Sequence, residues 1–86
     1  MANIEILREV CAGNEGDWRL CFQWARYHYE DDDPQMGYRF IWRRPDGSLQ
    51  AARGQARIPS ASEMFDLIGQ ASAAGWFVTA EATRND

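Results

Sequence analysis

The chain has 86 residues, of which 45% are hydrophobic and 13% aromatic, so it can build one small core and is not a disordered chain. We expect a single small α+β domain over residues 1–80 and a flexible tail over residues 81–86. The formal net charge of −4 argues against a protein that attracts nucleic acid through a positive field.

The first two segments, residues 4–11 and 17–29, can be interpreted in two ways. In the second segment, every other residue from Trp18 to Trp24 is large and apolar, which is typical of a half-buried strand. Helical spacing also fits parts of both segments, with Asp17 as a helix N-cap. We predict strands, because the next segment, 38–44, has a strand pattern and the aromatic segment 17–29 would pair well with it.

A hairpin is the best-defined unit of the sequence. Pro45-Asp46-Gly47 separates two strand-like runs, 38–44 and 48–58, and supplies the residues that a tight turn needs. A three-residue loop pairs Arg44 with Ser48 and places Trp42 opposite Gln50. The acidic run before it, Asp31 to Pro34, is predicted to be a solvated loop, because adjacent carboxylates repel one another and proline ends regular structure.

A helix is predicted over residues 60–74. Ser60 and Glu63 form a capping box at its start, apolar residues follow at helical spacing, and Gly75 ends it. Trp76 can then fold back onto the last turn. The expected fold is a four-stranded antiparallel meander (about 4–11, 17–29, 38–44 and 48–58) with this helix packed on one face. Tyr38, Phe40 and Trp42 are assigned to the covered face, and Phe40 and Ile68 are expected to be its most structural positions.

The basic residues are all arginine and gather in the middle of the chain. Residues 37–59 carry five arginines and one acid, whereas both flanks are acidic. On the uncovered sheet face we expect Arg39, Arg43 and Arg53 around an exposed Ile41, with Tyr27 and Tyr29 on a neighbouring strand. Arg39 opposite Arg53 is unfavourable unless an acid such as Glu5, Glu9 or Glu15, or a partner, lies nearby. The chain has twelve alanines and no lysine, so the preference for arginine can also be explained by the codon bias of a GC-rich bacterial genome.

Sequence motifs for catalysis or metal binding are absent. His28 is the single histidine, and Cys11, Cys21 and His28 match no zinc spacing and no nucleophile–base pattern. We therefore expect no enzyme, no metal and no cofactor. The start of the chain lacks a basic region followed by an apolar run, and no apolar stretch is long enough to cross a membrane, so we expect a cytoplasmic protein with reduced cysteines. A disulfide would require two neighbouring strands to bring the cysteines together.

Two functions fit these features. The first is a non-catalytic protein-interaction module that binds a protein partner, or a second copy of itself, through the arginine and aromatic sheet face. The alternative is binding of single-stranded nucleic acid through the same face, with tyrosines stacking on bases. The acidic balance of the chain favours the first. Both interpretations use the same residues: Arg39, Arg43, Arg53, Ile41, Tyr27 and Tyr29.

Overall fold

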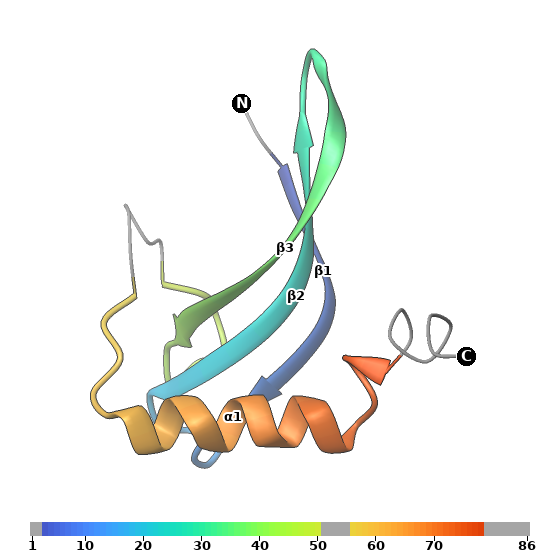
Figure 1. Cartoon of the computed structure of the whole chain (residues 1–86). Coiled ribbons are helices and arrows are strands. Elements are labelled where there is room, and N and C mark those ends of the chain that lie inside the picture. The colour runs from blue at the N-terminus through green and yellow to red at the C-terminus, as the bar shows by residue number, and fades with distance from the viewer. Residues whose placement is uncertain (1–2, 51–55, 79–86) are drawn as a thin grey trace.

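A computed structural model of the chain describes residues 3–50 and 56–78 (Figure 1). The described part contains three strands, β1 (Asn3–Cys11), β2 (Arg19–Tyr29) and β3 (Asp32–Arg43), followed by the helix α1 (Ala61–Ala73). The strands form one antiparallel sheet with β2 in the centre. The predicted α+β class is confirmed, and the first two segments are strands. Within the described ranges, no helix is long and apolar enough to span a membrane.

The prediction of a fourth strand over 48–58 is wrong for residues 48–50 and 56–58, and residues 51–55 lie outside the described residues. The turn itself is as expected, since the Arg44 amide donates to the Ser48 carbonyl at 2.7 Å and the Gln50 amide to the Trp42 carbonyl at 2.9 Å. Only one isolated bridge, Arg43 to Leu49, follows. Continued pairing would place Arg57 opposite Gln35, yet the Arg57 carbonyl accepts a hydrogen bond of 2.9 Å from the Trp42 indole. These positions on β3 are about 23 Å apart at strand spacing, so the chain has left the edge of β3.

The start of β3 also differs from the prediction. The acidic run was expected to be a loop, but β3 begins at Asp32 and only residues 30 and 31 form the turn after β2. The register is irregular here, because Tyr27 pairs with Gln35 while Tyr29 pairs with Asp32. Pro34 lies within this irregularity. Proline is tolerated at such a bulge, where its missing N–H costs no regular ladder bond.

Helix α1 has the boundaries and caps that the sequence predicts. The Ser60 hydroxyl accepts a hydrogen bond of 3.2 Å from the Glu63 amide at the N-terminus. At the other end Gly75 takes a positive φ of 88°, and the Trp76 amide donates to the Ala71 carbonyl at 3.1 Å. This hydrogen bond turns the chain back in a Schellman motif, which brings the Trp76 side chain against the core.

The core lies between α1 and the lower part of the sheet in Figure 1. Leu20 and Phe22 of β2 and Leu67 and Ala71 of α1 are its buried centre. The Trp76 ring stacks on Phe22 with ring centroids 5.6 Å apart.

The helix covers less of the sheet than expected. Phe40 and Trp42 pack against the core as predicted, but Tyr38 is 46% exposed. On the helix, the fully buried residue is Leu67, whereas Ile68 is only partly buried. The predicted emphasis on Ile68 was therefore misplaced by one position along the helix.

The upper half of the sheet extends beyond the helix as a twisted arm (Figure 1). We define the arm as residues 3–6, 25–29 and 32–38. Helix α1 does not reach the arm in Figure 1, and Phe77, which follows α1, contacts the arm at Tyr38. The Cα radius of gyration is 14.3 Å, compared with about 12 Å for a compact chain of this length, which agrees with this extended shape.

Candidate functional site

The predicted arginine face is held together internally. Glu9 lies on β1, and its carboxylate accepts two hydrogen bonds from Arg43 on β3, at 2.9 Å from Nε and 3.0 Å from Nη2. Arg43 also donates to the Gly47 carbonyl. A two-pronged contact of this kind is among the stronger ion pairs. Glu9 is thus an internal acid of the kind that the sequence required beside these arginines.

A buried glutamine extends this network across the central strand. Gln23 is 0% exposed, donates to Glu9 Oε2 at 2.6 Å and accepts from Arg39 Nε at 2.7 Å. Ile41 lies between the two arginines on β3 and is 5% exposed, so it is buried and not at the surface as expected. The guanidinium groups of Arg39 and Arg43 therefore provide hydrogen bonds to the buried Gln23 side chain and to the Glu9 carboxylate. Arg53 lies outside the described residues.

The two cysteines are joined in a disulfide beside this network, contrary to the expectation that they stay reduced. Cys11 and Cys21 are directly opposite each other on β1 and β2, with Cα atoms 4.0 Å apart and sulfur atoms bonded. Glu9 lies close enough to form a three-ligand group with them. Both sulfurs are used in the disulfide and the carboxylate is bonded to Arg43 and Gln23, so this group offers no ready metal site.

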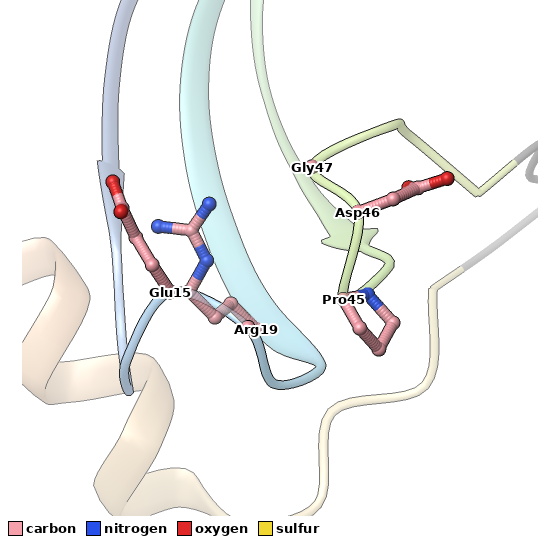
Figure 2. Close-up of a pocket in the computed structure, with 6 residues that line it drawn as sticks. Glu15, Arg19, Pro45, Asp46 and Gly47 are labelled. Carbon is pink, nitrogen blue, oxygen red and sulfur yellow. The ribbon is translucent and has the colours of Figure 1, made fainter.

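A polar hollow of about 340 Å³ lies between the β1–β2 turn and the turn after β3 (Figure 2). Arg19 lines it and stands opposite Arg43 in the sheet register. Among the described residues, the Arg19 Nε is buried without a hydrogen-bond partner. The side chains of Glu15 and Arg19 run along the sheet while the Asp46 carboxylate points away from them. Two carboxylates beside one guanidinium do not favour an anionic ligand.

The Asp46 carboxylate is part of the turn that borders this hollow. It accepts hydrogen bonds from the Ser48 hydroxyl at 2.7 Å and from the Ser48 amide at 2.9 Å. These bonds lower the pKa of Asp46 from its usual value, because they stabilise the charged form. The carboxylate thus serves to close the turn.

A second hollow, of about 300 Å³, is lined by two indole rings. Trp18 and Trp42 line it together with Gln50 and Arg57, and Trp18 is 51% exposed. The indole N–H of Trp42 is already bonded to the Arg57 carbonyl, so only its ring is free to contact a ligand. The alternating pattern of residues 18–24 predicts a half-buried strand position for Trp18, but Trp18 directly precedes β2 and is exposed.

The arm carries the densest set of exposed apolar side chains. Its exposed large apolar residues are Ile4, Ile6, Tyr29, Met36 and Tyr38. Sequence reasoning selected Tyr29 but missed the others. The arm was not expected because the third strand was predicted to begin at Tyr38, whereas β3 begins at Asp32 and extends beyond α1.

The two faces of the arm differ in character. On the helix side, Tyr38 is stacked against Trp24 with centroids 4.4 Å apart and meets Phe77 edge-on at 5.6 Å. On the other side, the Tyr27 ring packs against Gly37, where a Cβ would lie 3.5 Å from it. Tyr27 and Tyr29 thus both lie on the arm. The Tyr27 ring packs on the sheet, whereas Tyr29, at the end of β2, is 41% exposed.

A small charge cluster also lies on the helix side of the arm. The Glu5 carboxylate contacts the His28 ring at 3.1 Å and the Arg26 guanidinium at 3.2 Å. The hydrogen bond with His28 is the largest cause of a pKa for Glu5 below its usual value, and the charge of Arg26 adds to it. All three side chains are largely exposed, so this cluster links β1 to β2 at the surface and adds little stability.

Comparison with known proteins adds no further constraint, since no protein-family model, no curated protein and no solved structure matches this chain.

Proposed function

We propose that this protein is a non-catalytic protein-interaction module that binds through the arm of its sheet. The observation that carries the proposal is the exposure of Met36 and Tyr38, at 44% and 46%, on the part of edge strand β3 that extends beyond α1. Exposed apolar side chains gathered in one place mark binding surfaces, and an open strand edge offers backbone groups to a partner.

The arginine network supports a protein partner over single-stranded nucleic acid. Arg43 donates two hydrogen bonds to Glu9, and Arg39 donates its Nε to Gln23, so both guanidinium groups already have internal partners and are less available to phosphates. The exposed arm carries an acidic tip, with Glu30 and three aspartates in succession. A surface of that charge repels a phosphate backbone.

The non-catalytic part of the proposal rests on the chemistry of the reactive residues. Within the described residues, both cysteine sulfur atoms are joined in a disulfide, and the His28 ring contacts Glu5 on an exposed face. An exposed imidazole–carboxylate pair with no nucleophile beside it lacks the arrangement that acyl transfer requires.

Photo-crosslinking from the arm tests this function. A photoreactive phenylalanine replaces Tyr38 in one version of the full chain and Ser72, an exposed helix residue, in the other. We expect a discrete protein adduct from position 38 in the cells that make the protein, and none from position 72. Absence of any adduct at position 38, or equal adducts at both positions, would contradict the proposal.

A further inference from the structure

The edge of β3 that faces away from β2 presents a defined set of backbone groups, and from Gln35 to Ile41 no described segment pairs with it. In an antiparallel sheet the N–H and C=O of one residue point to the same side, and successive residues alternate. The carbonyl of Trp42 and the amide of Arg44 point away from β2, because they bond to Gln50 and Ser48. The β2–β3 register is regular from Gln35 to Arg43. The outward groups therefore belong to Met36, Tyr38 and Phe40.

Both ends of this free stretch are closed by the chain itself. At one end the Gln50 amide already occupies the carbonyl of Trp42. At the other end Pro34 has no N–H to offer a neighbouring strand. The open stretch thus has Tyr38 at its midpoint and one further outward-facing residue on each side. It is symmetric about Tyr38, which is what a strand needs in order to pair with an antiparallel copy of itself.

We propose that β3 pairs with β3 of a second copy of this chain, with Tyr38 opposite Tyr38, so that the two sheets become one continuous sheet. This inference rests on the proposed interaction function and names its partner. In this register Tyr38 exchanges both backbone hydrogen bonds with its counterpart, and Met36 does so with Phe40 of the other copy. Each outward amide of the open stretch then meets a carbonyl.

The charges along β3 favour this antiparallel arrangement. The strand begins with Asp32 and Asp33, and its second half carries Arg39, which uses its Nε for Gln23 and keeps its positive charge without a carboxylate among its hydrogen-bond partners in the described residues. Antiparallel pairing brings the acidic end of each strand toward the arginine end of the other, whereas parallel pairing would bring like charges together. The strand is therefore complementary in charge to a reversed copy of itself.

The side chains of the same residues gain contacts in this dimer. Met36, Tyr38 and Phe40 lie on the helix side of the sheet, and the first two are exposed in the single chain. Pairing places the two Tyr38 rings across from each other and Met36 across from Phe40. Aromatic and apolar cross-strand pairs of this kind stabilise antiparallel sheets.

The mass of the full chain in solution tests the dimer. Sedimentation equilibrium from low to high micromolar concentration should give twice the chain mass of 9.9 kDa. Met36→Pro removes an outward N–H that β2 does not use, and should weaken dimerisation at least tenfold. Met36→Thr is the matched control, because it shortens the same side chain but keeps the N–H, and it should remain dimeric. Circular dichroism checks that both variants are folded.

Amide hydrogen exchange gives a second measurement that needs no substitution. The amides of Gly37 and Arg39 point toward β2 and are protected in any state. The amides of Met36, Tyr38 and Phe40 should become protected only as the concentration rises. Fast exchange of these three amides at all concentrations, a monomer at high micromolar concentration, or a Met36→Pro variant that dimerises normally would each overturn the inference. A monomer that still crosslinks to a different protein from position 38 would refute the dimer and leave the proposed function standing.

Discussion

The disulfide between Cys11 and Cys21 should supply a large part of the stability of this small sheet. It closes a loop with a sequence separation of 10, for which the chain-entropy relation gives about 2.7 kcal/mol at 25 °C. Domains of this size have a free energy of unfolding of about 5–10 kcal/mol, so reduction removes a quarter to a half of it. At a urea dependence of about 1–2 kcal/mol per molar, the unfolding midpoint should fall by roughly 1.3–2.7 M.

Urea unfolding followed by tryptophan fluorescence, with and without a phosphine reductant, measures this difference. The double variant Cys11→Ala/Cys21→Ala is the control, since its midpoint should be low and should not respond to the reductant. An air-purified protein whose intact mass includes two free thiols would refute the reasoning. So would an oxidised protein whose midpoint is unchanged by reduction.

Three further outcomes follow from the core, the polar network and the arm. Leu67→Ala should lower the free energy of unfolding by about 2–5 kcal/mol in urea titrations, because this side chain is 0% exposed; a loss below about 1 kcal/mol would contradict its central place. In a double-mutant cycle of Glu9→Gln and Arg43→Met, the coupling energy should be about 1–3 kcal/mol, and strict additivity would mean that the ion pair is not formed. In an NMR titration, Glu5 should have a pKa below its usual value of 4.5, so the stability that its ionised form contributes is present above that pH and is lost as the pH falls through the lowered pKa. His28→Ala should raise the pKa of Glu5 again, and an unchanged pKa would contradict the contact.

The elements predicted correctly are those whose signals are local in sequence. The N-terminus of α1 is set by Ser60, whose hydroxyl accepts a hydrogen bond from the Glu63 amide, and its C-terminus by Gly75, which adopts a positive φ. Both signals act within one helical turn of the end that they determine. The Pro45-Asp46-Gly47 turn likewise determines the pairing of Arg44 with Ser48 through hydrogen bonds between near neighbours. Local geometry decides these features, so the chain order alone suffices to predict them.

The tertiary structure decided the features that depend on residues far apart in the chain. The pairing of Arg43 with Glu9 joins residues 34 positions apart, and the disulfide depends on the register of β1 with β2. Among the described residues, the hydrogen bond from the Trp42 indole to the Arg57 carbonyl shows that the chain does not continue along β3 as a fourth strand, and Tyr38 is exposed because α1 packs on the other end of the sheet. Such contacts depend on the relative free energies of many possible long-range pairings, and residue patterns along the chain carry little information about which pairing is the most stable.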